Sequence, residues 1–238
     1  MTKHSIGQVL LKNLALRAVS DPRFRASGSA NLQLAKAKNG KHSSWTTLIT
    51  LTSLQDPPRP PLELLFVLPK QLMNISGPTA AAAFDGFLSP IGRQSTPPPA
   101  SVEPPAILDT TDEPPPPRRR KSKPPPPPQK PMYRLLTLCD DLDSTPSSLK
   151  YQRGGGPKGH NGIRSLSSAL GGGPSSRDFH RLWIGIGRPE ERSQVARWVL
   201  SPLGREEVRA CEMGEEGRGG MALEKAWAEV LRVAYDED

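Results

Sequence analysis

The run YRLLTLC, at Tyr133–Cys139, is followed directly by a cluster of acids at Asp140, Asp141 and Asp143. A short run this rich in aliphatic side chains is typical of a strand that is buried in a sheet. In open α/β sheets, functional groups gather at the carboxyl ends of strands and in the loops that follow them. Asp140 is therefore a first candidate for a functional residue.

Strands and helices alternate on both sides of this run. Trp45–Leu54 and Leu62–Leu68 (LELLFVL) have the composition of strands, and the second is apolar enough to be buried on both faces. Further strands are predicted at Leu149–Gln152 and Arg181–Gly187. The apolar spacing predicts helices at 5–19, 77–88, 161–170, 195–199 and 221–234. The alternation favours the α/β class, with helices flanking a sheet.

The first helix has a predicted N-terminal cap. Ser5 is followed three positions later by Gln8. This is the spacing of a capping box, in which each side chain accepts a hydrogen bond from the other residue's backbone N–H. A helix is therefore expected to begin almost at the first residue.

A proline-rich segment interrupts the chain. Of the 28 prolines, 15 lie at 97–131, where RRRK at 118–121 stands between two proline runs. Such a composition does not form a packed core, so we predict a disordered Pro/Arg-rich insert at 92–131 within one discontinuous domain, 1–91 and 132–238. The insert could bind a Pro-motif-binding domain of the SH3 or WW type, contact RNA or the ribosome, or be a tolerated insertion without a role.

The net charge of +8 points weakly to a polyanionic partner. Residues 1–91 hold 10 basic and 4 acidic side chains, whereas 132–238 hold 15 and 16. A nucleic-acid surface must therefore come from the N-terminal block or from local clusters. Solvated surface charge together with a basic insert is the alternative explanation.

The sequence contains no signature of a membrane span or a metal site. No run approaches the roughly 20 apolar residues that cross a bilayer, and residues 1–25 lack the apolar centre of a signal peptide. Cys139 and Cys211 share no metal-binding spacing with each other or with a histidine. We therefore expect a soluble protein without metal, in a reducing compartment.

Polar residues that could perform chemistry occupy four places. Besides Asp140 they are His4, ahead of the first helix, Asn74, after the LELLFVL strand, and the pair His160 and Asn161, between a glycine loop and a helix. A histidine beside a carboxylate can take a proton from water, and amides can position that water and a carbonyl under attack. Structural explanations stand beside these roles: a frayed chain end for His4, a turn cap for Asn74, a solvated acid for Asp140, and a helix cap for Asn161.

Two common catalytic signatures are missing. The glycine triplet at 154–156 has neither the GxGxxG nor the GxxxxGK[ST] pattern of nucleotide-binding loops. No serine lies in a GxSxG elbow. We therefore expect neither a nucleotide cofactor nor a serine nucleophile.

Several stretches together resemble the bacterial-type peptidyl-tRNA hydrolase family. In order along the chain they are KHSIGQVLL at 3–11, MNISG at 73–77, LCDDLD at 138–143, GGGPKGHNGIRS at 154–165 and FHRLWIGIGRP at 179–189. The resemblance implies a single three-layer α/β domain with a mixed, mostly parallel sheet flanked by helices. It also implies a cytoplasmic or mitochondrial monomer, without metal or organic cofactor, that hydrolyses the ester joining a peptide to the 3′ end of tRNA.

The resemblance implies catalytic and substrate-binding roles as well. His4 matches the general base, and Asp140 matches the carboxylate that orients it. The residues that match the peptide-binding and water-binding positions, or lie in the same stretches, are Asn74, Asn161, Met73, Gly159 and His160.

Contacts with tRNA are less clearly marked. Two positions that are commonly basic in the family are Gln152 and Trp183 here. The cations nearby that could replace them are Lys150, Arg153, Lys158 and Arg181. The resemblance therefore leaves recognition of the tRNA 5′-phosphate in doubt.

The chain departs from the family pattern at its start. The family has a strand and a GNPG-like turn before its histidine segment, whereas this chain starts at Met1, after both. Either the sheet lacks a core strand or the stated start is not the native one, and we favour the second explanation. The missing strand also suggests an alternative function, that of a non-catalytic RNA-binding relative. A third hypothesis is an interaction module that acts through its proline-rich segment.

Overall fold

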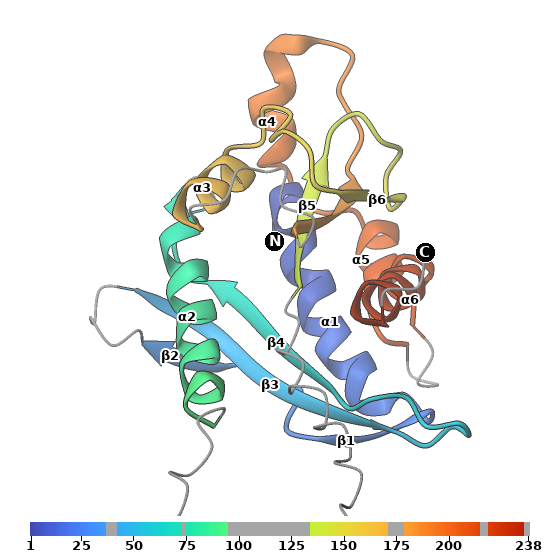
Figure 1. Ribbon diagram of the computed structural model, residues 1–238. Coiled ribbons are helices and arrows are strands. Elements are labelled where there is room, and N and C mark those ends of the chain that lie inside the picture. The colour runs from blue at the N-terminus through green and yellow to red at the C-terminus, as the bar shows by residue number, and fades with distance from the viewer. Residues whose placement is uncertain (37–41, 73–74, 95–133, 171–178, 215–218, 236–238) are drawn as a thin grey trace, which may run out of the picture.

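The computed structural model describes residues 1–36, 42–72, 75–94, 134–170, 179–214 and 219–235 (Figure 1). Most of the predicted insert lies outside these residues. Its first three residues are described, and they belong to helix α2 (Gly77–Gln94), which extends past its predicted end at Leu88.

An antiparallel sheet forms the N-terminal half of the fold. Its central strand β3 (Ser43–Ser53) pairs with β4 (Leu62–Pro69) along one edge and with β1 (Phe24–Ser27) and β2 (Gln33–Lys36) along the other. The predictions of β3 and β4 are confirmed. The sequence analysis missed β1 and β2, because strands of 4 residues are too short to show a periodicity.

A second, mixed sheet lies in the C-terminal half. Strand β5 (Leu135–Asp141) runs parallel to β7 (Phe179–Gly185), and β6 (Leu149–Arg153) runs antiparallel to β7. The α/β class is confirmed, but the expectation of one mostly parallel sheet is wrong for the described strands, which form two sheets with β5–β7 as their parallel pair. One reason is the short link from β3 to β4, because only a longer crossover can place two consecutive strands in parallel.

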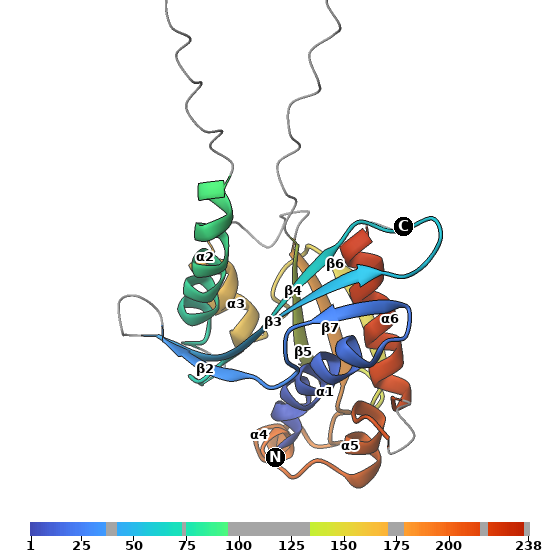
Figure 2. The ribbon, with the colours of Figure 1, turned by 90° about the horizontal axis from the view of Figure 1, so that it is seen from below.

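Helices cover both sides of the sheets. Helices α1 (Ile6–Ser20) and α6 (Met221–Tyr235) pack together on one side, and α2 packs with α3 (Asn161–Ala169) on the other (Figures 1 and 2). The buried side chains accordingly form a larger cluster around α1 and α6 and a smaller one around α3. No helix in the described part of the chain is both long and apolar enough to cross a membrane.

The start of the chain is fixed to a C-terminal segment. A 3-10 helix, η1 (Lys3–Ser5), leads into α1, and the Lys3 N–H donates to the Ser201 carbonyl at 2.9 Å. The Lys3 ammonium lies 2.6 Å from Oε1 of Glu207, in helix α5 (Arg205–Cys211), and both side chains are nearly buried. It also lies 4.7 Å from the ring centre of Trp198 in α4 (Val195–Val199). These contacts show that His4 does not sit on a frayed end.

The predicted capping box does not form. Ser5 makes no side-chain cap bond to α1, and its backbone angles are φ −89° and ψ 3°. A capping residue needs an extended backbone, whereas Ser5 already belongs to the helical turn of η1. Its hydroxyl lies 3.3 Å from that of Thr2 instead.

Glycine sets the approach of α1 to the second sheet. A Cβ on Gly7 would lie 3.2 Å from the Leu138 carbonyl oxygen of β5, so a larger residue would push the helix away. Because Gly7 lies one helical turn after His4, this contact fixes the position of His4 relative to the end of β5.

The Lys3–Glu207 ion pair supplies a stability test. In Lys3→Met the Glu207 carboxylate would stay buried without its cation, so the free energy of unfolding should fall by about 3 kcal/mol. Urea denaturation measures it. The matched control is Arg209→Ala, which removes an exposed pair with Glu206 and should change the free energy by less than about 0.5 kcal/mol. An equal loss in both variants would contradict a structural role for the buried pair.

Candidate active site

Two histidines share one buried carboxylate at the end of β5. Nδ1 of His4 lies 2.9 Å from Oδ2 of Asp140, and Nε2 of His160 lies 3.3 Å from Oδ1. The Asp140 side chain is 7 % exposed and that of His4 is 32 % exposed, so the carboxylate is enclosed while the His4 ring reaches solvent. Nδ1 of His4 is buried and makes no well-aligned hydrogen bond, so its contact with Asp140 is a close approach that becomes an ion pair when His4 is protonated.

The contacts of His160 fix its tautomer. His160 is the N-cap of α3, and its Nδ1 accepts a hydrogen bond from the Ile163 backbone N–H at 3.2 Å. A ring nitrogen that accepts from an amide carries no proton, so the proton of the neutral ring is on Nε2, which donates to Asp140. His160 therefore holds one oxygen of Asp140, and the other oxygen faces His4. The capping role that Asn161 could have played belongs to His160.

These contacts shift the pKa values of both partners. Burial alone would raise the pKa of Asp140, but its close contacts with His160 and His4 lower it to about 2. The interaction with the Asp140 carboxylate raises the pKa of His4 above its ordinary value, and partial burial opposes this only in part. Asp140 is thus ionised near neutral pH, and His4 is a stronger base than a free histidine.

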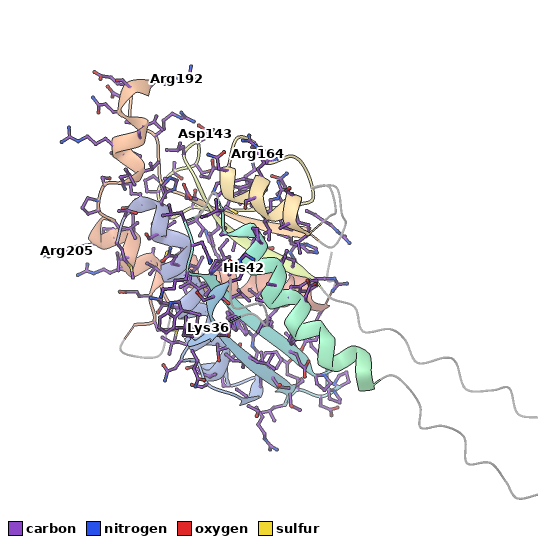
Figure 3. All side chains as sticks on the ribbon, turned by 90° about the vertical axis from the view of Figure 1, so that its left-hand side faces the viewer. Lys36, His42, Asp143, Arg164, Arg192 and Arg205 are labelled. Atoms are coloured by element: carbon purple, nitrogen blue, oxygen red, sulfur yellow. The ribbon has the colours of Figure 1, made fainter. Side chains whose placement is uncertain are left out.

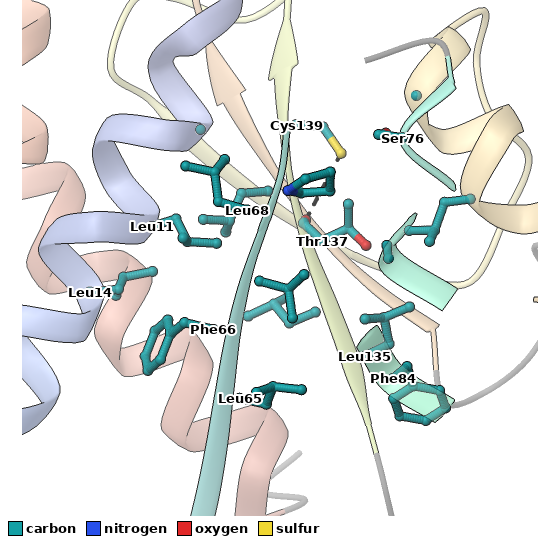
Figure 4. A pocket seen from close by; sticks show the side chains of 18 of the residues that line it. Leu11, Leu14, Leu65, Phe66, Leu68, Ser76, Phe84, Leu135, Thr137 and Cys139 are labelled. Atoms are coloured by element: carbon teal, nitrogen blue, oxygen red, sulfur yellow. Dashed lines mark hydrogen bonds between the residues drawn. The ribbon is translucent and has the colours of Figure 1, made fainter. Parts of the chain in front are cut away.

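The three residues lie on the wall of a pocket of about 410 Å³. Its lining is mainly apolar and comes from α1, β4, α2, β5, α3 and α6 (Figure 4). The pocket explains a wrong expectation about β4. Of the LELLFVL residues only Phe66 is buried, Glu63 is exposed and the others are partly buried, because this strand faces the cavity.

The glycine loop next to His160, at 154–156, is fixed by hydrogen bonds from the side chain of Arg181. This side chain has no exposed surface, and its guanidinium donates to the carbonyls of Gly156 at 2.6 Å and Gly155 at 2.5 Å. The prediction that Arg181 contacts tRNA disagrees with the structure, because a fully buried cation that serves two carbonyls cannot reach a phosphate. Gln152 and Trp183 bond to each other, with the indole N–H donating to Oε1 at 2.9 Å.

The other predicted site residues are not all brought together. Met73 and Asn74 lie outside the described residues. Asn161 is exposed, lies outside the pocket lining, and accepts a hydrogen bond from Arg164 at 3.1 Å. Gly159 is exposed at the turn before His160 and has a φ of +82°, which suits glycine. The roles assigned to these residues remain predictions.

The predicted tRNA-binding cations other than Arg181 are on the surface. Lys150, Arg153 and Lys158 are all exposed. The Lys158 ammonium lies 5.8 Å from the centre of the Trp183 ring, and the His160 ring packs against the same ring in a T-shaped arrangement, with 5.9 Å between the ring centres. Lys158 and His160 therefore both pack against the indole ring of Trp183, which places Lys158 close to the site.

Sequence reasoning missed the second histidine of the pair. His160 was placed among substrate-binding residues, and its bond to Asp140 was not foreseen. A signal was present, since His160 directly precedes a predicted helix whose free N–H groups attract an acceptor.

The coupling of Asp140 and His4 gives a test by titration. In Asp140→Asn the main cause of the raised pKa is gone, so the midpoint of His4 should fall to its ordinary value of 6.5 or below. Imidazole NMR signals followed across pH measure it. The control Asp143→Asn removes an exposed partner of Arg188 and should leave His4 unchanged. An unchanged midpoint in Asp140→Asn would contradict the pairing.

Comparison with known proteins finds a match over part of the chain. Residues 128–223 match the family model described as peptidyl-tRNA hydrolase. The peptidyl-tRNA hydrolase of Chromohalobacter salexigens is 45% identical over 78 residues, which is 33% of this chain and 39% of that protein. That of Acidithiobacillus ferrooxidans is 47% identical over 68 residues, 29% of this chain and 34% of that protein. The aligned part thus spans less than two fifths of these relatives.

Solved structures agree at the level of the fold. The crystal structure of peptidyl-tRNA hydrolase from Acinetobacter baumannii aligns with a TM-score of 0.52 and 19% identity, over 99% of this chain and 82% of that one. Its Arg119Gln mutant gives the same TM-score and identity over 98% and 80%. At this identity the likeness concerns the fold alone. Together with the sequence match over 128–223, it makes the chain similar to peptidyl-tRNA hydrolases in that part of its sequence and in its fold.

Proposed function

We propose that this protein hydrolyses the ester bond between a peptide, or an N-blocked amino acid, and the 3′ end of tRNA. The observation that carries the proposal is the pairing of His4 with Asp140, itself held by His160, on the wall of an apolar pocket. The relatives that align over 78 and 68 residues of this chain are named peptidyl-tRNA hydrolases. Peptidyl-tRNA is accordingly the proposed substrate.

The geometry suggests how His4 would act. Its Nδ1 faces Asp140, so Nε2 is the nitrogen that remains to take a proton from water. The water oxygen would then attack the ester carbonyl carbon, and the ribose oxygen would leave with the proton that His4 returns. The anionic Asp140 stabilises the imidazolium that exists between these two transfers, and a histidine whose pKa is raised above its ordinary value can act as a base near neutral pH.

The cations near the site fit a polyanionic substrate. Lys150, Arg153 and Lys158 are exposed on β6 and on the glycine loop, and Lys158 shares the Trp183 ring with His160. A tRNA whose 3′ end reached His4 would bring phosphates close to this loop. We propose these three side chains, without Arg181, as the tRNA contacts.

The decisive test is hydrolysis by His4→Ala. Without its base the enzyme should lose about 100-fold or more in kcat, while tRNA binding is retained. Release of free tRNA from a purified N-blocked aminoacyl-tRNA measures turnover, and filter binding measures affinity. The control His42→Ala removes a histidine that lies outside the pocket lining and should keep its activity.

The outcomes separate the two functions under consideration. Unchanged turnover in His4→Ala would refute the assignment of the base. A wild-type protein that binds N-blocked aminoacyl-tRNA tightly but does not hydrolyse it to free tRNA would be the non-catalytic RNA-binding relative. The exposed position of Asn161, whose side chain does not belong to the pocket lining, is the observation that favours this second candidate.

A second test concerns the phosphate contact of Lys158. In Lys158→Ala one phosphate contact is lost, so the slope of log affinity against log salt should decrease by about one, while kcat stays the same. The control is Lys36→Ala on β2, which Figure 3 shows away from the end of the molecule that carries Asp143 and Arg164. Equal slopes for Lys158→Ala and the wild type would contradict the contact.

A further inference from the structure

The His160 ring is restrained at three points. Its Nδ1 accepts from the Ile163 N–H at 3.2 Å, and its Nε2 donates to Oδ1 of Asp140 at 3.3 Å. These bonds hold the two nitrogens, but they leave the ring free to turn about the line that joins them. The third restraint is the Trp183 indole, which packs against the imidazole with 5.9 Å between the ring centres and 74° between the planes. This T-shaped contact opposes the remaining rotation.

The Trp183 indole is itself held in one orientation. It is buried, and its N–H donates to Oε1 of Gln152 at 2.9 Å. Gln152 lies diagonally across from Trp183 on the paired strand β6, and its Nε2 donates to the Gly154 carbonyl at 3.0 Å. Both ends of the amide have a partner, so the amide cannot flip without losing both bonds. A Cβ on Gly155 would clash with Nε2 of Gln152, so the glycine loop packs directly against this amide.

We propose that Trp183 is a positioning residue for the hydrolysis of peptidyl-tRNA, because it fixes the His160 ring that orients the Asp140 carboxylate toward His4. This role rests on the proposed function. Trp183 belongs to β7, His160 is the N-cap of α3, and Asp140 lies near the end of β5, so the contacts join three elements behind the base. At 4 % exposure the Trp183 side chain is too deeply buried to touch the substrate, so its effect must pass through His160.

The charged or titratable groups around His160 and Trp183 come from several elements. They are His4 of η1, Cys139 and Asp140 of β5, Lys150 of β6, Lys158 of the loop after it, Arg164 of α3, and His180 and Arg181 of β7. Burial raises the pKa of the Cys139 thiol far above its usual range, and the pKa of Asp140 is about 2. His180 pairs with the Tyr151 hydroxyl at 2.7 Å. A titration near neutral pH that depends on Asp140 therefore reports on His4 and His160.

Loss of the indole should change His4 in a defined direction. Without Trp183 the His160 ring can turn away from Asp140, and the carboxylate then loses a hydrogen bond that shares its charge. The full charge of Asp140 acts on His4, so the pKa of His4 should rise further above its ordinary value. Asp140→Asn has the opposite effect, because it removes the charge itself. The direction of the shift therefore separates loss of the positioning contact from loss of the carboxylate.

The first test compares two buried tryptophans in the full chain. Trp183→Leu should lower kcat about tenfold for release of tRNA from an N-blocked aminoacyl-tRNA, and should move the acid limb of the pH profile of kcat to higher pH. The control is Trp227→Leu, which also removes a buried indole, one whose N–H donates to Asp21 at 2.6 Å. It should lower the free energy of unfolding but leave the pH profile and kcat unchanged. Equal changes in both variants would mean a merely structural role and would overturn the proposal.

A second variant keeps the test independent of whether Trp183→Leu folds. Gln152→Leu leaves the indole in place but removes its acceptor and the bond to the glycine loop. The acid limb should move in the same direction, with a smaller loss of kcat. A shift to lower pH, or none, would count against the proposal.

A double-variant cycle shows whether Trp183 acts through His160. His160→Ala should lower kcat at least as much as Trp183→Leu does, and adding Trp183→Leu to His160→Ala should cause no further loss. Losses that multiply in the double variant would refute the proposal, because Trp183 would then act by another route.

Imidazole NMR separates this proposal from the proposed function, because it needs no substrate. The titration midpoint of His4 should be higher in Trp183→Leu than in the wild type, even if the wild-type protein hydrolyses nothing. A higher midpoint without wild-type turnover would support the chain of contacts and refute the hydrolysis. An unmoved midpoint with normal wild-type turnover would overturn the role of Trp183 and leave the hydrolysis standing.

Discussion

The structure of the site depends on one buried carboxylate and the two imidazoles that face it. A buried anion is unfavourable unless charge or hydrogen bonds compensate for its lost hydration, and Asp140 receives both, from His4 and His160. The elements that supply these partners are far apart in the chain: η1 at the start, the end of β5, and the N-terminus of α3. Their positions are in turn fixed by the Lys3 ion pair and by the close contact of Gly7 with β5.

Most elements could be predicted from the sequence, and the reasons are local. LELLFVL forms β4 and the LLTLC part of YRLLTLC forms most of β5, and the 3–4 spacing of apolar residues in 221–234 matches α6 closely. The pairing of strands was harder to predict, because the two sheets and their edges depend on contacts between distant segments. The missed strands β1 and β2 have only 4 residues each, too few to show a pattern.

The residues of the candidate site could likewise be predicted from the sequence, but their contacts could not. Its titratable members, His4, Asp140 and His160, were all identified from the sequence, because each stands at an element end where functional groups collect. What the sequence could not show was how each is used. Arg181 looked like an exposed cation beside a glycine loop, yet it is buried beneath that loop, and burial of an arginine follows only from the three-dimensional course of β7 and the loop.

The buried Arg181 has a consequence for the loop itself. Its two hydrogen bonds to the carbonyls of Gly155 and Gly156 restrict a segment that contains three consecutive glycines and would otherwise have many conformations. A loop that is already ordered loses little entropy when a ligand arrives. A ligand that contacts the glycine loop would therefore meet a rigid surface of complementary shape. Its association rate would not be limited by a conformational change of the glycines.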